Sequence, residues 1–426
     1  MLDLKFIREN PELVKENIRK KFQDEKIALV DKLLETDKKH RELLQKSQSL
    51  RHERNKVSAE IAALKKEGKD VSDLMEKAKQ IPEDIKKIEE TQKQLEEEIR
   101  NYLYQIPNII HESVPIGKDD SENVELEKIG EPVVPDYEIL HHAELAEKLG
   151  GVDFESARDT SGHGFYYLTG DLAMMHSAML AFARDYMIKQ GFKYVIPPFM
   201  IRRKVVEGVM SFAEMDAMMY KIEGEDLYLI GTSEHSMIGR YIGRTVDEKQ
   251  LPITLTSYSP CFRKEVGSHG IEEKGLYRLH QFEKQEMIVI CKPHESYEWY
   301  EKMLQYTVDV FRALNVPVRK LECCSGDLAD LKAKSADVEA WSPRQKKYFE
   351  VGSCSNLTEA QARRLKIRVT DGKEKYYPHT LNNTVLASPR ALIAVLENNQ
   401  NVDFSVTIPE ALRPYMGGKE KIVPVK

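Results

Sequence analysis

The sequence predicts an α+β protein in which an N-terminal antiparallel helical hairpin is joined to a larger body of mixed helices and strands. Residues 1–105 contain only three helix-breaking residues, Pro11, Gly68 and Pro82. Four prolines and two glycines crowd into residues 106–135, which is typical of a linker or an irregular edge. Residues 136–426 alternate helical and β-rich segments. We therefore expect a domain at 1–105, a linker at 106–135 and a second domain at 136–426.

The hairpin is expected at about 27–103. Asn10-Pro11-Glu12 reads as the start of a short helix, because proline is tolerated in a first turn. A long helix is predicted from Ile27 to Leu64, then a polar turn at 66–70, with Ser72 as the N-cap of the returning helix. Pro82 should kink that helix or shift its start. The returning arm follows a heptad seam of mostly apolar residues: Ala78, Ile81, Ile85, Ile88, Gln92, Leu95, Ile99 and Tyr102.

Each arm of the hairpin would be about 50 to 60 Å long. Two helices of this length have little core of their own, so the hairpin should project from a larger body. A dimerisation coiled coil or a spacer is the simpler interpretation of a charged hairpin.

The composition limits the classes of partner. Of the 426 residues, 31% are charged and the formal net charge is -6, so a nucleic acid would have to bind to local basic patches. No stretch reads as a signal peptide or a membrane span. The five cysteines fit neither a disulfide framework nor a zinc motif. Reduced, partly buried thiols in a cytoplasmic protein are therefore expected.

The body contains recognisable helices and strands. Helices are expected at 141–149, 171–190, 296–314 and 390–399, and β-rich runs lie at 194–197, 226–230, 253–258, 287–291 and 317–323. The helix at 171–190 ends at Gly191 and leads into a strand and Pro197-Pro198.

The most informative stretch is a predicted β-hairpin with charged and aromatic residues on both arms. One arm ends in Phe262-Arg263-Lys264-Glu265, and the other carries Arg278 and Phe282 and ends near Glu286. Arginine forks bind phosphate, and an aromatic face stacks on adenine. The pattern therefore suits an ATP site that has no P-loop. A surface hairpin with ordinary ion pairs is the simpler alternative.

Two further polar segments follow apolar strands. Gly231-Thr232-Ser233-Glu234-His235 delivers a hydroxyl and a carboxylate to one place, although Thr232 could also be a helix N-cap. We expect His235 to be structural. Glu350-Val-Gly352-Ser353 offers carboxylate and hydroxyl oxygens that suit Mg²⁺, and a polar strand end is the alternative.

A last segment runs from Asn382-Asn383-Thr384 to Arg390, at the start of an apolar helix. An arginine at a helix N-terminus faces an unfavourable dipole unless an anion shares the site. The position of Arg390 therefore indicates a functional role.

Together these motifs resemble the class II aminoacyl-tRNA synthetases. Helix–Gly191–strand is similar to motif 1, the 262–286 hairpin to motif 2, and Arg390 to the arginine of a glycine-poor motif 3. Their order behind a helical hairpin resembles the seryl-tRNA synthetase family from residue 1 to about 415. The resemblance implies an antiparallel-sheet catalytic domain at 136–426 and a tRNA-binding domain at 1–105.

The resemblance also implies a role for each matching residue. Arg263 would act at the α-phosphate and the serine carboxylate, Phe282 and Arg390 would enclose adenine, and Glu350 with Ser353 would ligate Mg²⁺. Gly352 departs from a common serine, and no tRNA contact is assigned to loop 266–277. The implied ATP ligands are Arg263, Glu265, Arg278, Phe282, Glu350, Ser353 and Arg390; the implied serine ligands are Thr232, Glu234, Arg263, Glu286, Asn382 and Thr384.

The family reaction is the activation of L-serine by ATP to seryl-adenylate, followed by transfer to the 3′ end of tRNA(Ser), and of tRNA(Sec) where it exists. The resemblance implies a cytoplasmic homodimer in which the hairpin binds tRNA through positions such as Lys38, Lys39, Arg41, Lys46, Arg51, Arg54 and Lys56. The layout matches the common form, so no zinc is expected. A ligase that loads an amino acid onto a carrier protein is the main alternative, although such relatives lack the hairpin. A coiled-coil interaction protein with an inactive body is a third.

Overall fold

A computed structural model describes residues 1–265 and 275–425. The chain forms two compact units. One contains Leu2–Arg19 and Gln23–Pro107, and the other contains Met1, Lys20–Phe22 and the residues from Asn108 onward.

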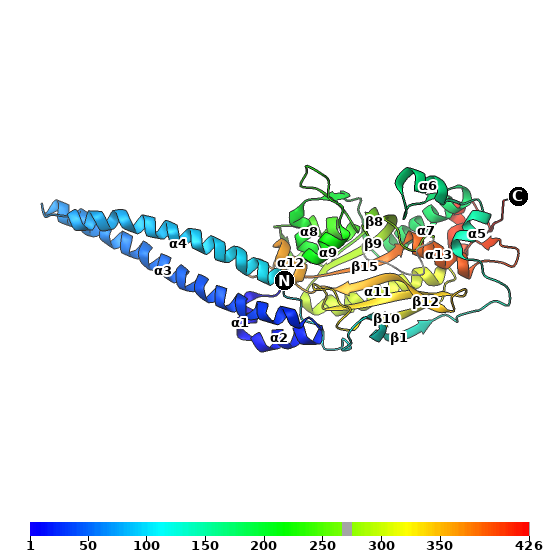
Figure 1. Cartoon of the computed structure of the whole chain (residues 1–426), viewed down its shortest axis with the longest axis horizontal. Coiled ribbons are helices and arrows are strands. Elements are labelled where there is room, and N and C mark those ends of the chain that lie inside the picture. Colours follow the sequence, from blue (N-terminus) through cyan, green and yellow to red (C-terminus); the bar gives the residue numbers. More distant parts are fainter. Residues whose placement is uncertain (266–274, 426) are drawn as a thin grey trace. The chain divides into compact units, whose positions relative to one another are not determined.

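The N-terminal unit is helical throughout. Short helices α1 (Leu4–Glu9) and α2 (Pro11–Lys20) precede a 3-10 turn at Asp24–Lys26, α3 (Ile27–Lys66) and α4 (Ser72–Gln105). Helices α3 and α4 run side by side over their length (Figure 1). Apolar seam residues are buried between them, among them Val57, Ile81 and Ile85. The predicted helical hairpin is confirmed.

One detail of the hairpin prediction is wrong. Ser72 is the first residue of α4, and its N-cap is Val71. The Ser72 hydroxyl does not accept from the helix backbone but donates to Asp70, which also accepts from the backbone N–H of Ser72. Of the two effects expected of Pro82, a shift of the helix start does not occur, since α4 begins ten residues earlier and continues through it. The kink stays a prediction. Packing of Ile81 and Ile85 against α3 outweighs the lost backbone donor.

The larger unit is built on an eight-stranded sheet in the order β1-β10-β11-β12-β15-β9-β8-β4. Every neighbouring pair is antiparallel except β4 and β8, which confirms the α+β antiparallel fold. The strand bounds are β1 Val124–Ile129, β4 Lys193–Tyr194, β8 Ile253–Phe262, β9 Gln281–Cys291, β10 Val318–Glu322, β11 Lys334–Ser342, β12 Lys347–Asn356 and β15 His379–Ala387.

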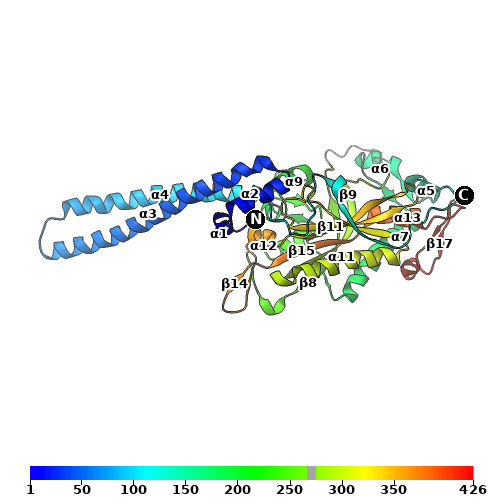
Figure 2. The same ribbon diagram turned by 90° about the horizontal axis from the view of Figure 1, so that it is seen from below.

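The longer helices of this unit pack on the sheet and close the main core. They are α7 (Gly170–Lys189), α11 (Ser296–Ala313) and α13 (Ser388–Asn398), and Figure 2 shows α11 lying along the sheet. Tyr300, Phe311 and Met179 are fully buried in the core cluster. The shorter helices are α5 (His142–Lys148), α6 (Phe154–Ser161), α8 (Arg203–Val209), α9 (Phe212–Met218), α10 (Ser233–Gly239) and α12 (Ala360–Leu365). The shorter strands are β2 (Val152–Asp153), β3 (Tyr167–Leu168), β5 (Met200–Ile201), β6 (Tyr228–Leu229), β7 (Thr245–Asp247), β13 (Arg368–Thr370), β14 (Lys375–Tyr376), β16 (Val406–Thr407) and β17 (Lys421–Ile422).

The segment predicted as a linker contributes an edge strand. Residues 106–135 include β1, which pairs with β10. Ion pairs tie it to the sheet, with Arg319 Nη1 2.9 Å from Glu125 Oε2 and Lys320 Nζ 3.0 Å from Glu127 Oε2. Its pairing depends on partners almost 200 residues away, so the local proline and glycine content gave no sign of it.

The strand expected at 194–197 is shorter than predicted. Strand β4 ends at Tyr194, because Pro197 and Pro198 cannot donate to a ladder.

The five cysteines are buried free thiols, as expected. Among the described residues, no helix is long and apolar enough to cross a membrane.

Candidate active site

The β8–β9 hairpin places the predicted motif 2 residues at one pocket. In its register Cys261 faces Phe282 and Ser257 faces Glu286. The side chains of Phe282 and Lys284 point into the pocket, as period-two alternation along a strand requires. The pocket is lined by Arg263, Glu265, Tyr277, Arg278, Leu279, Phe282, Lys284, Glu350, Val351, Gly352, Thr384, Ala387, Pro389 and Arg390.

Two guanidinium groups stack on aromatic rings in this pocket. Arg263 lies over Phe282, 5.2 Å from the ring centroid, and Arg390 lies over Tyr277 at 4.6 Å. Both distances are within the range of cation–π attraction. All four side chains line the pocket, which therefore offers both aromatic and guanidinium groups on which an aromatic ligand can stack.

Arg390 is also paired with a carboxylate. Its Nη1 atom lies 2.9 Å from Glu350 Oε2. Partial burial of the Glu350 carboxyl opposes its ionisation, but the charge of Arg390 outweighs this and lowers the pKa of Glu350. An arginine at a helix N-terminus is expected to share its site with an anion. The Glu350 carboxylate is that anion.

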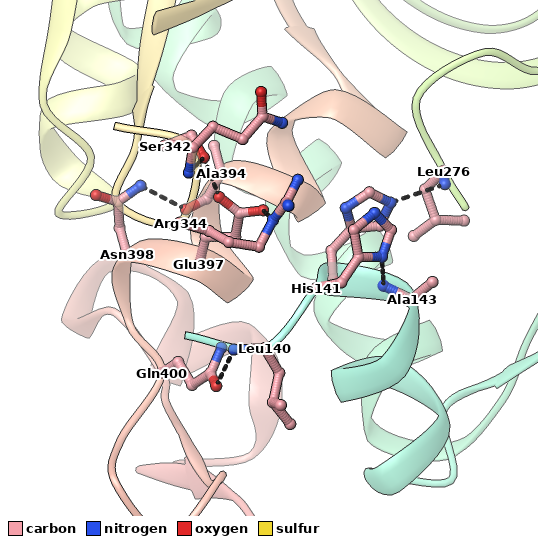
Figure 3. A network of polar contacts seen from close by, with 12 residues as sticks. Leu140, His141, Ala143, Leu276, Ser342, Arg344, Ala394, Glu397, Asn398 and Gln400 are labelled. Atoms are coloured by element: carbon pink, nitrogen blue, oxygen red, sulfur yellow. Dashed lines mark hydrogen bonds and ion pairs between the residues drawn. The ribbon is translucent and has the colours of Figure 1, made fainter. Parts of the chain in front are cut away.

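A polar network fixes the far end of the helix that carries Arg390. Glu397, near the end of α13, has a fully buried side chain and accepts from Ser342 and Arg344 at 2.5 and 3.2 Å (Figure 3). Asn398 donates to the carbonyl of Trp341. These contacts hold α13 against the β11–β12 turn and so determine where its first turn lies.

A histidine holds the segment that leads into the second arm of the motif 2 hairpin. The Nε2 atom of His142 accepts from the backbone N–H of Leu276 at 3.1 Å, and Figure 3 shows Leu276 beside the histidines at the start of α5. Gly275 has φ +105°, and a β-carbon there would lie 2.2 Å from His142 Nε2. Burial lowers the pKa of His142 to about 3, so the ring is neutral and can accept. This contact positions Tyr277 and Arg278.

A second set of polar groups adjoins the pocket beyond Arg263. The Nε atom of Arg263 donates to the Gly231 carbonyl at 3.3 Å. Thr232 is the N-cap of α10, as the structural interpretation predicted, and its hydroxyl also donates to Glu286 Oε2 at 3.2 Å. Lys284 forms an ion pair with Glu286, and both side chains are buried.

Glu234 and His235 follow in α10. Burial, then the nearby Glu286 carboxylate, raises the pKa of Glu234 to about 7. Burial also lowers the pKa of His235 to about 3. His235 is thus a neutral buried histidine, which agrees with the structural role expected for it.

The Glu350–Ser353 segment divides between the pocket and the sheet. Glu350 and Gly352 line the pocket. The Ser353 hydroxyl lies 3.4 Å from Ser335 Oγ and hydrogen-bonds Asp337. Burial and then the charge of Glu350 raise the pKa of Asp337 to about 7. Over the described residues, no group of three or more His, Cys, Asp or Glu side chains is placed to hold a metal ion.

Gly352 is explained by packing. A β-carbon at this position would lie 3.2 Å from Thr307 Cγ2 and 3.3 Å from the Thr384 carbonyl. Both distances are tighter than ordinary contacts, so a serine here would require its neighbours to move.

Most predicted site residues come together. Arg263, Glu265, Arg278, Phe282, Glu350, Thr384 and Arg390 line the pocket, and Thr232, Glu234 and Glu286 form the adjoining cluster. Asn382 and Ser353 are not among the lining residues. Loop residues 266–274, to which no tRNA contact was assigned, lie outside the described residues.

Sequence reasoning missed three residues that contribute to the site. Tyr277 stacks with Arg390, Lys284 pairs with Glu286, and Gln361 contacts Glu234. The alternation of Lys284 with Phe282 and Glu286 was a usable signal. Gln361 gave none, because its partner is 127 positions away.

Comparisons with known proteins agree with this geometry. A family model of the class II tRNA synthetase core domain (G, H, P, S and T) matches residues 219–399, and one of the seryl-tRNA synthetase N-terminal domain matches residues 1–110. The fold and the site therefore define a class II tRNA synthetase.

Individual relatives show which family within the class II tRNA synthetases the chain resembles. A serine--tRNA ligase from Methanocella arvoryzae is 47% identical over 423 residues, covering 99% of this chain and 100% of the relative. The crystal structure of seryl-tRNA synthetase from Pyrococcus horikoshii complexed with ATP superposes with a TM-score of 0.96 at 42% identity, covering 100% of both chains. That of the cytoplasmic serine-tRNA ligase from Naegleria fowleri in complex with AMP gives 0.89 at 34%, covering 100% and 99%. The chain belongs to the serine–tRNA ligase family.

Proposed function

We propose that the pocket binds ATP and L-serine side by side and that the chain joins serine to tRNA through seryl-adenylate. Membership of the family makes the chain an ATP-using ligase. The observation that carries the residue assignment is the convergence of Arg263, Phe282, Glu350 and Arg390 on one pocket, beside the buried Lys284–Glu286 ion pair.

At the ATP end, each group has a chemical reason for its proposed role. Adenine would lie between the Phe282 ring and the Arg390 guanidinium, with Glu265 near the purine amine. Arg263 would bind the α-phosphate, since its fork lies between Phe282 and Gly231. The side chain of Arg278 is 46% exposed, so it can reach the outer phosphates.

At the serine end, the acceptors suit an ammonium group and a hydroxyl. Glu234 and Glu286 would bind the serine ammonium together with Thr232, and Thr384, paired with Glu286 in the sheet register, would contact the hydroxyl. Asn382, on the same strand, is the remaining proposed ligand. A pocket built to pair the hydroxyl rejects alanine, because its polar groups would be left unsatisfied.

The donor set near Glu350 fits a hard cation. Carboxylate and hydroxyl oxygens from Glu350 and Ser353 are the ligand types that Mg²⁺ prefers, completed by phosphate oxygens and water. Asp337 lies beside Glu350 with a pKa raised by burial and by the Glu350 charge, and a cation bound there would favour the ionised form of both carboxylates. When bound, Mg²⁺ would neutralise phosphate charge.

The reaction needs no activated protein nucleophile. In the first step a serine carboxylate oxygen forms a bond to the α-phosphorus, and the bond to the bridging oxygen of pyrophosphate breaks. In the second step the terminal ribose hydroxyl of tRNA attacks the acyl carbon, and AMP leaves. Arg263 would hold the two reactants in line and stabilise the growing negative charge.

We assign tRNA binding to the helical hairpin, on the 1–110 match to the N-terminal domain of the family. Several of its basic side chains already pair with carboxylates: Lys39 with Glu35 at 2.7 Å, and Arg51 with Glu89 at 2.6 Å. Phosphate contacts would exchange these partners, and binding would weaken with salt. Deletion of 28–101 should preserve amino acid activation and abolish tRNA charging.

We also propose a homodimer formed through the segment after α7. Ile196 is 71% exposed and Met200 47%, and the groove that they line also contains Val195, Pro197 and Pro198. Exposed apolar side chains of this size next to a groove mark an interaction surface. Ile196→Asp should shift the mass measured by light scattering from dimer to monomer. A wild-type monomer would refute this part.

The cytoplasm is the compartment that the thiols favour, because five buried free cysteines suit a reducing environment. Charging of tRNA(Sec) would follow from the same reaction wherever that tRNA occurs.

The decisive experiment is ATP–pyrophosphate exchange with serine, alanine, threonine and glycine. Exchange should depend on serine and be far slower with the other three. Exchange driven equally by alanine would refute the assignment of the serine end. Charging of a carrier protein, with none of tRNA, would favour the alternative ligase.

A further inference from the structure

The carboxylate of Glu234 is held from behind by a buried glutamine on a different element. Gln361, on α12, donates from Nε2 to Glu234 Oε1 at 2.7 Å. Thr380, on β15, donates from its hydroxyl to Gln361 Oε1, also at 2.7 Å. Gln361 and Thr380 are fully buried. Three side chains far apart in the sequence thus form one chain of hydrogen bonds that ends at Glu234.

The hydrogen-bonding partners of Gln361 determine which way its amide group is oriented. The amide nitrogen of Gln361 faces two acceptors, Glu234 Oε1 at 2.7 Å and the Val209 carbonyl at 3.4 Å. An ionised carboxylate and a carbonyl can only accept. A flipped amide would turn its oxygen toward both acceptors, and Glu234 would lose its donor. The Thr380 hydroxyl, which can donate, therefore matches the amide oxygen.

We propose that Gln361, oriented by Thr380, is a positioning residue that fixes the Glu234 carboxylate for the serine ammonium group. This inference rests on the proposed serine-binding role of Glu234. Gln361 touches neither ATP nor serine in the proposed site, so its effect would pass through Glu234 alone. A carboxylate that already has its ligand-bound orientation loses less conformational entropy when the ligand binds, and this increases affinity.

The charges around Glu234 make the effect visible in a pH profile. Glu286 and Lys284 on β9 and Lys332 before β11 are the charged groups that act on Glu234, and Gln361 adds a donor that favours its ionised form. Removing that donor should raise the pKa of Glu234. The acid limb of kcat/KM for serine should then move to higher pH, which general loosening of the fold would not produce.

Gln361→Leu is the direct test, measured by serine-dependent pyrophosphate exchange. We expect the KM for serine to rise about tenfold or more, since a hydrogen bond to a charged group is lost. The KM for ATP should stay within about twofold, because the ATP end makes no contact with Gln361. If wild-type chain shows no serine-dependent exchange, the proposed function itself fails. If wild type is active and the variant keeps both its serine KM and its acid limb, the positioning role is overturned.

A matched control is Gln400→Leu. Gln400 is also buried, and its Oε1 atom accepts from the Leu140 backbone N–H at 3.0 Å (Figure 3). The Gln400→Leu substitution should lower the stability of the protein without raising the KM for serine. An equal rise in both variants would overturn the inference.

A second pair of variants covers the case in which Gln361→Leu does not fold. Thr380→Val removes the hydroxyl at nearly constant shape and should raise the serine KM about threefold, with the same shift of the acid limb. Thr380→Ser keeps the hydroxyl and should restore wild-type behaviour. Identical profiles for Thr380→Val and wild type would also overturn the inference.

Discussion

At the proposed ATP end of the pocket the charged side chains are partly exposed and pair with one another, whereas at the serine end they are buried and backed by further hydrogen bonds. The Glu350 and Arg390 side chains are 43% and 25% exposed. Those of Glu286 and Lys284 are 2% and 7% exposed. Exposed pairs contribute little to stability and exchange partners easily. A buried pair is costly to break, so its geometry is fixed by the fold.

The difference matches what the two substrates require. ATP carries several negative charges and an aromatic base. The side chains that bind it must therefore exchange their contacts with one another for contacts with ATP. Serine is small, and its recognition depends on a few acceptors held in place. We therefore expect substitutions at the ATP end to affect catalysis more than stability, and substitutions at the serine end to affect both.

The largest expected effect is that of Arg263→Ala. Arg263 touches both ends, stacking on Phe282 and donating to the Gly231 carbonyl. Exchange should fall by about 10² to 10³-fold, the cost of removing one donor from a developing negative charge. Arg263→Lys should recover only part of the rate, because a single ammonium cannot replace the fork. Normal exchange in the alanine variant, with its fold confirmed by circular dichroism, would break the assignment.

Glu286→Gln should show how much the buried ion pair at the serine end contributes to stability. It leaves Lys284 without its carboxylate partner, so the free energy of unfolding should fall by about 3 kcal/mol. Urea denaturation measures this directly. The serine KM should rise in the same variant while the ATP KM changes little. An unchanged urea midpoint would mean that the buried pair is not rigidly held, and the contrast between the two ends would disappear.

The pH dependence sharpens the comparison further. The pKa of Glu234 is raised to about 7 by burial and by Glu286, so this carboxyl takes up a proton as the pH falls through neutrality. The protonated form cannot pair with the serine ammonium. The value of kcat/KM for serine should therefore fall below about pH 7 and approach tenfold per pH unit. Glu234→Gln should remove this limb together with most of the activity. A flat profile from pH 5.5 to 8 would contradict the assignment.

The hairpin and most of the site could be read from the sequence because their signals are local. The heptad of α4 needs only its own apolar spacing. Phe262–Glu265, Arg278 and Phe282 lie at the facing ends of two neighbouring strands or in the residues next to those ends. Strand β1 could not be predicted, since ion pairs to β10 stabilise it. Gln361 was equally hidden, because its role comes from Glu234 and Thr380 on other elements.

The Ser72 prediction failed for a different reason. Both Asp70 and Ser72 favour the start of a helix, and the sequence does not say which accepts. In the structure Asp70 accepts and Ser72 donates. Local residue preference thus located the helix start to within one residue but not the direction of the hydrogen bond.

Arg278→Ala should have the smallest effect and is the matched contrast to Glu286→Gln. Its Nη1 atom lies 3.5 Å from Glu265 Oε2, and the two side chains are 46% and 23% exposed. Losing such a pair should change the free energy of unfolding by less than about 1 kcal/mol. The ATP KM should nevertheless rise several-fold, because an outer-phosphate contact is removed, and this rise should shrink with added salt. Urea denaturation and exchange kinetics at two salt concentrations separate these effects. A loss of stability as large as that of Glu286→Gln would show that the ATP end is as rigidly built as the serine end.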